Sequence, residues 1–527
     1  MEPVPSDTGI DSLSHRKRSA TESLSSSSDE KRNKPNHHHP SQAPIYLFTT
    51  RDRERTPNDR SFREMLGYDM ATASLTIHSM ILCNYMIDFE FLLHEIPELL
   101  TIPQVTVFYG HETNPEYLMQ WKQATSVDVR LLRPSDPPRS LHNPLPLRIP
   151  YGVHHSKIIL FGYREETTQQ EKLRLIIHTA NLLERDIYRK IQGACIQDFP
   201  LKTTERLSSS SDFEHDLVAY FETYDYIRPR IWSPSTQTSP CSLTQWLRQY
   251  DFSSATVALV PSTPGYHRVS DSEHPNRALQ GHLRIQQLLR QRWTRNTKHP
   301  SPANSVGPVV CQFSSMGSLT EKYLNELYQS MDVLSATRPK HERPSPSQVS
   351  LAQKLQLVYP TVEQIRTSYE GYAGGGSVPG PYRNVSKAFL RPLYHRWSDE
   401  GRKHVGHIKT YYQLSNGGST DDANDNSADD TMEWFVLTSH NLSKAAWGEG
   451  QMRSAGRRLF IRHWELGVWL GSSDETKLAP YGTTIPQAWK IPLPYPVRPV
   501  RYRVNDQPWA VDGVYDIPDA LGCVQLG

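Results

Sequence analysis

The stretch HHSKIILFGY (residues 154–163) places two histidines and a lysine directly in front of a run of apolar residues. A related stretch, GHIKTYYQL (406–414), occurs much later in the chain. Each is followed by a second apolar segment that ends in a hydroxyl residue, a spacer and Asn-Leu, within LRLIIHTANLLERD (173–186) and EWFVLTSHNLSKAAWG (433–448). A single His-x-Lys is common by chance, whereas the same order of motifs twice indicates an internal repeat.

The polar residues of each repeat are expected to converge. Side chains at positions i and i+2 of a strand project to one face, so each histidine shares a face with the lysine two residues on. Each asparagine follows a predicted buried strand and opens a helix; it is either an ordinary cap or a group that faces an anion. The doubled set predicts a pocket for a tetrahedral oxyanion, with two imidazoles available for attack or proton transfer. Its members are His155, Lys157, Asn181, His407, Lys409 and Asn441.

Composition limits the class of protein. The chain has 527 residues, of which 37% are hydrophobic, so it can bury a large core and form two domains or more. Its net charge of +2 means that nucleic-acid binding would depend on a local basic patch. The five cysteines are scattered without a CxxC pair, which favours a reducing compartment over a disulfide framework or a cysteine zinc site. No apolar run approaches the ~18 residues of a membrane span, so we expect a soluble, non-secreted protein with no membrane partner.

Two segments are too polar to pack. Residues 1–44 are rich in Ser, Pro and charge, and we expect them to be disordered. Basic clusters at 16–18 and 31–34 are spaced like a bipartite nuclear import signal, which predicts a nuclear protein, although a solvated charged tail has the same composition. Residues 414–431 are acidic and rich in Gly, Asn and Ser, which predicts a flexible surface insertion.

Further motifs extend the pattern of the two repeats. They are STPG (262–265), CQFSSMGSL (311–319), YPTVEQIRTSYEGYAGGGSVP (359–379), HRWSDE (395–400) and WELGVW (464–469). With the His-x-Lys repeats, they resemble the phospholipase D superfamily and, within it, the tyrosyl-DNA phosphodiesterases, from about residue 45 onward. The superfamily's Asp, five residues after each Lys, is replaced by Gly162 and Leu414. That departure favours the tyrosyl-DNA branch over the lipid-cleaving members.

The resemblance implies an α/β fold. The expected architecture has two pseudo-symmetric halves, 45–260 and 261–527, each an α-β-α sandwich around a mixed sheet, with the active site between them. His155 is then the nucleophile that forms a covalent phosphohistidine, and His407 is the general acid and base. The two lysines and two asparagines of the repeats would hold the equatorial phosphate oxygens. Internal symmetry alone does not say which histidine attacks.

The resemblance also implies roles outside the repeats. Glu465 would orient His155, and Gln192 would orient His407, so that a carboxylate and a neutral amide separate the two imidazole pKa values. Ser314, Ser315, Ser443 and Lys444 would contact DNA phosphates, and Ser377 and Pro379 would face a peptide. Such Ser- and Gly-rich segments are otherwise ordinary turns. We expect no metal and no cofactor, because cationic and amide donors surround the site and no carboxylate cluster is visible in the sequence.

The implied activity is hydrolysis of the bond between a DNA 3′ end and a tyrosine of trapped type IB topoisomerase, leaving a 3′ phosphate. The expected partners are single-stranded or frayed duplex DNA 3′ ends and the tyrosyl peptide, and the protein is expected to act as a monomer. Two alternatives remain from the sequence. One is another superfamily nuclease or lipid phosphodiesterase, and the other is an inactive module that binds DNA ends.

Overall fold

The two repeats fold into two mixed β-sheets that share one strand order. In spatial order, the first sheet contains β2 (Asp59–Arg60), β1 (Ile45–Phe48), β9 (Gly193–Pro200), β7 (Glu171–His178), β6 (Ile158–Glu165), β3 (Leu75–Ile87), β4 (Gln104–Glu112) and β5 (Asp128–Leu132). The second contains β12 (Ala258–Ser262), β22 (Glu465–Gly471), β19 (Met432–Thr438), β18 (Thr410–Leu414), β14 (Val309–Gln312), β15 (Leu355–Val358) and β16 (Tyr394–His395). In addition, β23 (Leu478–Pro480) pairs with β19, and β24 (Trp489–Ile491) pairs with β23.

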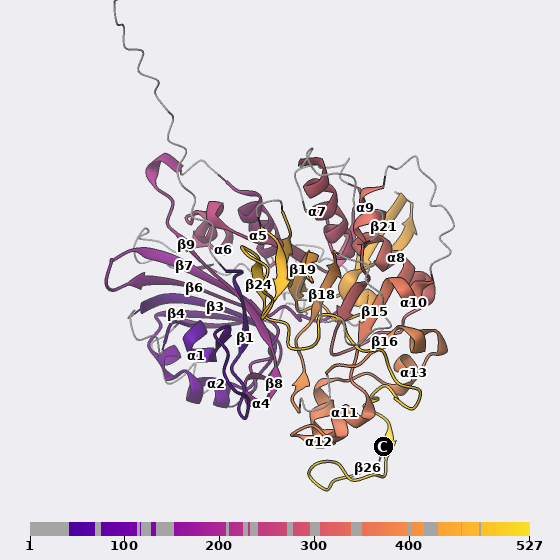
Figure 1. The fold of residues 1–527 in the computed structure, drawn as a ribbon. Coiled ribbons are helices and arrows are strands. Elements are labelled where there is room, and N and C mark those ends of the chain that lie inside the picture. Colours follow the sequence, from indigo (N-terminus) through magenta and orange to yellow (C-terminus); the bar gives the residue numbers. More distant parts are fainter. Residues whose placement is uncertain are drawn as a thin grey trace, which may run out of the picture. The chain divides into compact units, whose positions relative to one another are not determined.

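Strand direction repeats as well as strand order. From β1 to β3 each strand is antiparallel to its neighbour, and β3, β4 and β5 are parallel. From β12 to β14 the neighbours are likewise antiparallel, and β14, β15 and β16 are parallel. The expected pseudo-symmetric pair of mixed sheets is therefore confirmed (Figure 1).

The computed structural model describes residues 42–68, 75–112, 116, 128–132, 152–206, 210–224, 230–231, 241–270, 278–295, 306–338, 350–398, 403–415, 430–454, 456–473 and 476–526. The predicted disordered tail lies outside these residues up to residue 41, and the acidic insertion lies outside them from 416 to 429. The ends of both segments need correction. Ala43 is fully buried, Leu414 ends β18, and Asp430 is buried in an ion pair with Arg498 (2.7 Å). These residues have apolar or charged partners that the composition of the segments does not reveal.

Alternating side chains divide the interior into three cores. In β6, Ile158 and Leu160 face a core that both sheets share, whereas Ile159 and Phe161 face the outer core of the first sheet. The same alternation in β19 puts Phe435 into the shared core. Because side chains alternate along a strand, a continuous apolar run such as IILF is the pattern of a strand covered on both faces.

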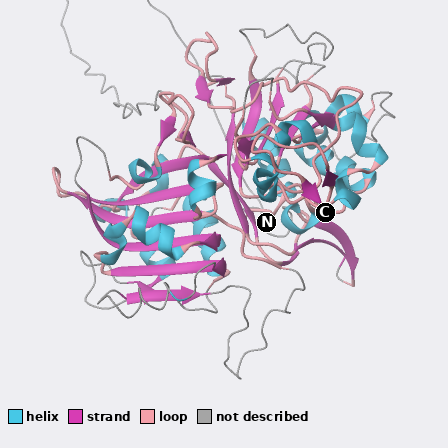
Figure 2. Ribbon diagram, turned by 90° about the horizontal axis from the view of Figure 1, so that it is seen from below, coloured by secondary structure: helices cyan, strands magenta, loops and turns pink. Residues whose placement is uncertain are grey.

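Helices cover the outer faces of the sheets. The first sheet is covered by α1 (Phe62–Met65), α2 (Phe89–Glu95) and α4 (Glu184–Tyr188), and the second by α7 (His282–Arg295), α8 (Glu321–Met331) and α9 (Val333–Thr337). The helices α5 (Asp212–Glu222) and α6 (Leu243–Leu247) join the shared core. Figure 2 shows helices laid across one face of the left-hand sheet. Side chains that cap helix starts include Ser61, Asp88, Ser211 and Thr320.

Short elements complete the described chain. The remaining helices are α10 (Leu351–Lys354), α11 (Val362–Arg366), α12 (Gly371–Gly374), α13 (Tyr382–Val385) and α14 (Lys444–Trp447), with 3-10 turns η1 (Pro97–Leu100), η2 (Thr204–Arg206), η4 (Phe252–Ser254), η5 (Gly375–Ser377) and η6 (Ala388–Leu393). The small strand groups are β8 (Lys190–Ile191) with β17 (Val405–Gly406), β10 (Arg230–Ile231) with β11 (Cys241–Ser242), β13 (Gly265–His267) with β20 (Glu449–Arg453) and β21 (Gly456–Ile461), and β25 (Val514–Tyr515) with β26 (Gln525–Leu526). Of the helices that are described, none is long and apolar enough to cross a membrane.

Replacing Phe435 by Ala should strongly destabilise the protein. The side chain is 1% exposed in the core that joins the sheets, and a buried Phe→Ala change costs ~3–5 kcal/mol of unfolding free energy. Urea unfolding followed by tryptophan fluorescence measures the loss. Val504, which is 93% exposed, is the matched control, because Val504→Ala should change stability by no more than about 0.5 kcal/mol. Equal effects of both changes would contradict this assignment of the core.

Candidate active site

Both His-x-Lys segments lie immediately before a central strand. β6 begins at Ile158 and β18 at Thr410, so each lysine precedes its strand instead of lying within it. The backbone ladder nevertheless continues through them. His178 N donates to Lys157 O (3.0 Å), and Thr438 N donates to Lys409 O (3.1 Å). The two motifs therefore occupy equivalent positions, at the N-terminal end of a central strand in each sheet.

Each lysine turns its ammonium back onto its own motif. Lys157 Nζ donates to His155 O (3.0 Å), and Lys409 Nζ donates to His407 O. Both lysines are fully buried. Burial lowers the pKa of Lys157 to about 8. Burial and the charge of Lys157 together hold the pKa of Lys409 well below its usual range. Two buried ammonium groups, one of which lowers the pKa of the other, are a site for an anion.

Backbone pairing across the two halves brings each histidine to its orienting residue. The bridge between His154 and Trp464 is followed by a hydrogen bond from His155 N to Trp464 O (3.0 Å). In the other half, β17 pairs with β8, and His407 N donates to Ile191 O (3.0 Å). Glu465 follows the first pairing and Gln192 the second. Each of these two side chains thus reaches the imidazole of the opposite half.

The resulting side-chain contacts have the expected geometry. His155 Nδ1 lies 2.8 Å from Glu465 Oε2, and His407 Nδ1 lies 2.9 Å from Gln192 Nε2. Thr179, the hydroxyl residue of the first repeat, sets the orientation of the amide, a role that the sequence did not suggest. Its hydroxyl accepts from the backbone N of the residue after Gln192 (3.0 Å) and donates to Gln192 Oε1 (2.7 Å), so Nε2 faces the imidazole.

The two imidazoles are neutral but sit in different environments. Burial lowers the pKa of His155 to about 4, and the Lys157 charge adds to this, while Glu465 opposes it. Burial and the charges of Lys409 and Lys157 hold the pKa of His407 well below its ordinary value. Burial raises the pKa of Glu465, but His155 outweighs this and keeps the carboxyl well below its usual range. With Nδ1–H donated to a carboxylate, His155 directs the lone pair of Nε2 outward.

Asn181 brings an unpredicted carboxylate into the site. Its Nδ2 and backbone N donate to Asp186 Oδ2 at 2.8 and 3.1 Å. The same oxygen lies 3.5 Å from His407 Nδ1, and burial raises the pKa of Asp186. The second repeat has Ala446 at the equivalent position, five residues after Asn441. That break in the repeat is the signal by which the sequence could have identified Asp186.

Asn441 is oriented by the predicted phosphate-binding serines. Its Oδ1 accepts from Ser314 N (3.2 Å), Ser314 Oγ (3.2 Å) and Ser315 N (2.9 Å). These bonds leave Nδ2 as the donor end of the amide. Ser314 and Ser315 thus lie beside Asn441, as expected of residues that serve one site, and their contact with DNA remains a prediction.

The other predicted binding residues have structural partners. Ser443 caps α14 by accepting from Ala446 N (3.1 Å), and Lys444 pairs with Glu449. Ser377 is buried in η5, and Pro379 is exposed. Glu370, at the start of α12, forms an ion pair with Lys190. Lys190 belongs to β8, which pairs with β17 of the other half. Binding roles for these four residues remain predictions.

Two neighbouring histidines are structural. His154 Nε2 bonds with Tyr224 Oη (2.9 Å), and this agrees with its predicted position on the other face. His440, for which the sequence suggested no role, contacts Ser262 Oγ through Nε2 (2.8 Å) and stacks on Trp447 with centroids 4.2 Å apart. Within the described ranges, no group of three or more His, Cys, Asp or Glu side chains is arranged to hold a metal ion.

Comparisons with known proteins agree on one family. A family model described as tyrosyl-DNA phosphodiesterase matches residues 44–503. Tyrosyl-DNA phosphodiesterase 1 of Arabidopsis thaliana is 32% identical over 490 residues, covering 84% of this chain and 71% of that protein. A probable tyrosyl-DNA phosphodiesterase of Caenorhabditis elegans is 29% identical over 484 residues, covering 90% and 89%. A crystal structure of yeast tyrosyl-DNA phosphodiesterase has the same fold, with a TM-score of 0.57 and 16% identity over 88% of this chain and 98% of that one.

The buried His440 should make stability depend on pH. Burial lowers its pKa to about 4 in the folded protein, against about 6.5 when unfolded. Between these values the unfolded chain binds the extra proton, so the contribution is present above pH 6.5 and is lost as pH falls toward 4. His440→Gln should flatten the pH dependence of the unfolding free energy by ~1.4 kcal/mol per pH unit in this range. Urea unfolding at pH 7.5, 6.0 and 5.0 measures it, and parallel curves for parent and variant would contradict the assignment.

Proposed function

Because the chain belongs to the tyrosyl-DNA phosphodiesterase family, we propose that it hydrolyses the 3′-phosphotyrosyl bond left when a type IB topoisomerase is trapped on DNA. Other groups that block a DNA 3′ end would be removed in the same way, leaving a 3′ phosphate. The observation that carries this proposal is the pair of imidazoles from opposite halves, one held by Glu465 and the other by Gln192, beside two buried lysines.

In the first step, His155 Nε2 attacks phosphorus and the bond from phosphorus to the tyrosine oxygen breaks. Glu465 supports this role because it keeps the proton on Nδ1 and stabilises the positive charge that develops on the ring. His407 gives a proton from its outward nitrogen to the departing phenolate. Since a phenol has a pKa near 10, this acid assistance is useful without being decisive.

In the second step, His407 takes a proton from water as the oxygen attacks phosphorus. The bond from phosphorus to His155 breaks, and the 3′ phosphate is released. In both steps the charged phosphodiester resists an incoming nucleophile, and the cationic and amide donors offset this repulsion. Removing one such donor costs ~3 kcal/mol in comparable oxyanion sites. Lys157, Lys409, Asn181 and Asn441 supply four.

Substrate binding would prepare His407 as an acid. In the free protein the pKa of His407 is lowered first by burial and then by the ammonium groups of Lys409 and Lys157, and a bound phosphodiester would place negative charge beside these ammonium groups. The repulsion from the lysines then decreases, and the imidazole gains a proton. Asp186 Oδ2 lies 3.5 Å from His407 Nδ1 and supports this proposal, because a carboxylate near that nitrogen stabilises the imidazolium. A protonated Nδ1 donates instead of accepting, so the Gln192 amide, whose Nε2 faces Nδ1 in the free protein, would turn its Oε1 toward the ring.

We further propose that the protein works as a nuclear monomer on single-stranded or frayed DNA ends. The basic clusters of the N-terminal 44 residues support nuclear import. A site that draws both histidines from one chain needs no second copy. Tyrosyl peptides of topoisomerase would lie on the side of Ser377 and Pro379, and the DNA strand on the side of Ser314, Ser315, Ser443 and Lys444.

The two histidines should give different defects. His155→Ala should abolish release of tyrosine from a 3′-phosphotyrosyl oligonucleotide, because no N–P bond can form. His407→Asn should slow the second step by ~10²–10⁴-fold, the usual contribution of a general base, so covalent protein–DNA adduct should accumulate on a denaturing gel. EDTA is present throughout, since the mechanism needs no metal.

The reverse pattern, an adduct with His155→Ala and none with His407→Asn, would exchange the two roles. Equal DNA binding by the parent protein and both variants, with no turnover of any substrate, would identify an inactive end-binding module. Cleavage of phosphatidylcholine in preference to the oligonucleotide would identify a lipid phosphodiesterase.

Substrate binding should also take up a proton. His155→Ala binds the 3′-phosphotyrosyl oligonucleotide without cleaving it, and calorimetry in two buffers of different ionisation enthalpy counts the protons exchanged. We expect net uptake approaching one proton at pH 7, because the bound phosphodiester raises the lowered pKa of His407. The double variant with His407→Asn should show no such uptake. Proton release by the single variant would contradict the charge argument.

A further inference from the structure

An exposed stack of arginines and aromatic rings lies on the small sheet formed by β13, β20 and β21. Tyr266 of β13 and Phe460 of β21 are cross-strand partners, and their rings stack with centroids 4.6 Å apart. The Arg453 guanidinium lies over Tyr266 at 4.0 Å, and the Arg462 guanidinium lies over Phe460 at 5.5 Å. We call these four residues the arginine–aromatic ladder.

The ladder is attached to both sides of the active site. The β20–β21 hairpin occupies the chain between α14, which follows Asn441, and β22, which begins at Glu465. Arg462 N and His463 N both donate to Ala445 O, at 3.0 and 3.1 Å. β13 follows β12, whose last residue, Ser262, is the register partner of Glu465. Short, hydrogen-bonded connections therefore fix the ladder relative to the catalytic side chains.

Among the described residues, no ion pair neutralises the ladder arginines. On the same hairpin, Arg457 pairs with Glu326 (2.5 Å), and Lys444 beside it pairs with Glu449. Arg453 and Arg462 are exposed, and in the part of the chain that is described they contact aromatic rings and no carboxylate. Stacking a guanidinium on a ring holds it in place while its N–H edge stays available for a phosphate.

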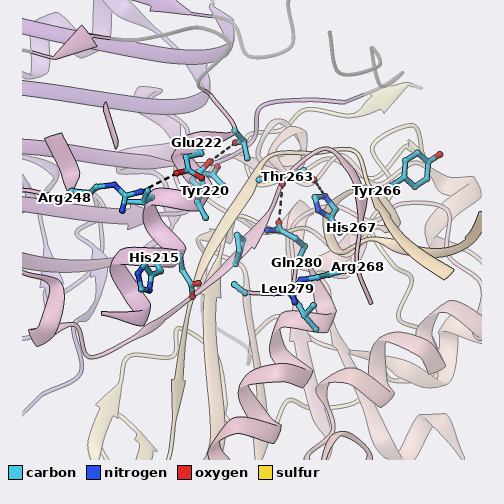
Figure 3. Close-up of a pocket in the computed structure, with 16 residues that line it drawn as sticks. His215, Tyr220, Glu222, Arg248, Thr263, Tyr266, His267, Arg268, Leu279 and Gln280 are labelled. Atoms are coloured by element: carbon cyan, nitrogen blue, oxygen red, sulfur yellow. Dashed lines mark hydrogen bonds and ion pairs between the residues drawn. The ribbon is translucent and has the colours of Figure 1, made fainter. Parts of the chain in front are cut away.

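A cavity borders the ladder at Tyr266. It has a volume of about 560 Å³ and lies between α5 of the first half and residues 261–268 and 278–280 of the second. Figure 3 shows Tyr266 at its edge with the ring turned away from Arg248 and His215. The cavity has the size of ordinary ligand sites, so a nucleotide that crosses the ladder has room beside it.

We infer that the ladder binds the phosphates of single-stranded DNA several nucleotides upstream of the reacting 3′ end. The occupant is a polyanion because the two free charges are both positive, and contact through guanidinium groups gives binding without sequence preference. This inference rests on the proposed function, and it adds a second contact region at a distance from the reacting phosphorus. Short substrates would not reach it.

The test compares two substrates with the same 3′-phosphotyrosyl end, one of about 4 nucleotides and one of about 16. These lengths are roughly the shortest and longest single strands that one single-strand-binding domain covers. The double variant Arg453→Ala/Arg462→Ala should raise KM for the long substrate about tenfold without changing kcat. It should leave both constants unchanged for the short one. The slope of log affinity against log salt for the long strand should fall by ~0.7 for each phosphate that the variant no longer binds.

Arg457→Ala is the matched control, because this arginine lies on the same hairpin but is already paired; it should leave all values close to the parent. Arg453→Lys/Arg462→Lys, which keeps charge but removes the planar stack, should fall between parent and double alanine variant. Far-ultraviolet circular dichroism checks folding, and each single alanine variant provides a second measurement.

Unchanged KM and salt slope for the long substrate in the double variant would overturn the inference, as would equal changes for both lengths. DNA binding is also measured by fluorescence polarisation with a 16-nucleotide strand that carries no tyrosine. If this binding needs the ladder while no protein cleaves the tyrosyl substrates, the proposed function fails and the ladder stands. If the tyrosyl substrates are cleaved normally and DNA binding does not need the ladder, the proposed function stands and the ladder inference fails.

Discussion

The structure depends on exchange of partners between two repeats. Neither half contains a complete site, because the carboxylate that accepts from His155 comes from β22 and the amide that contacts His407 follows β8. The exchange needs the two sheets at a fixed spacing, and the core they share sets it. Backbone bonds from His155 to Trp464 and from His407 to Ile191 then set the register to within a single residue. The positions of the two imidazoles and their partner side chains therefore depend on how the two halves pack.

The same packing sets the electrostatics. Lys157 and Lys409 are fully buried. Burial lowers the pKa of both lysines, the charge of Lys157 lowers that of Lys409 further, and the nearby carboxylates Glu465 and Asp186 offset this cost only in part. A bound phosphodiester completes the neutralisation. The unfavourable energy is electrostatic repulsion between buried charges, and not distortion of the backbone. A phosphate that binds between these charges relieves the repulsion, so the site favours binding of that group.

Sequence periodicity and the repeat were enough to predict the central strands, the two His-x-Lys segments and the turns that hold Asn181 and Asn441. They predicted these features because each is local or is doubled in the chain. Thr179 belongs to the repeat as its hydroxyl residue, but its role was not predicted, because its bond to Gln192 joins separate segments and has no sequence period. Asp186 is marked only by the break in the repeat at Ala446, and its contacts with Asn181 and His407 appear only in the folded chain. The ladder was equally invisible, since Tyr266 and Phe460 meet only through the register of β13 on β21. The predicted strands included each histidine, whereas β6 and β18 begin three residues later, directly after lysines whose ammonium groups turn back onto the histidine carbonyls.

The inequality of Glu465 and Gln192 has a consequence for how such a protein can arise. If two copies of a single repeat formed such a site as a homodimer, every substitution would appear twice, and both imidazoles would contact the same kind of side chain. A chain that carries both repeats is free of this constraint, so one imidazole can contact a carboxylate and the other an amide. The same holds for Asp186 and Ala446. Covalent linkage of the repeats thus allows the two imidazoles to differ in proton affinity.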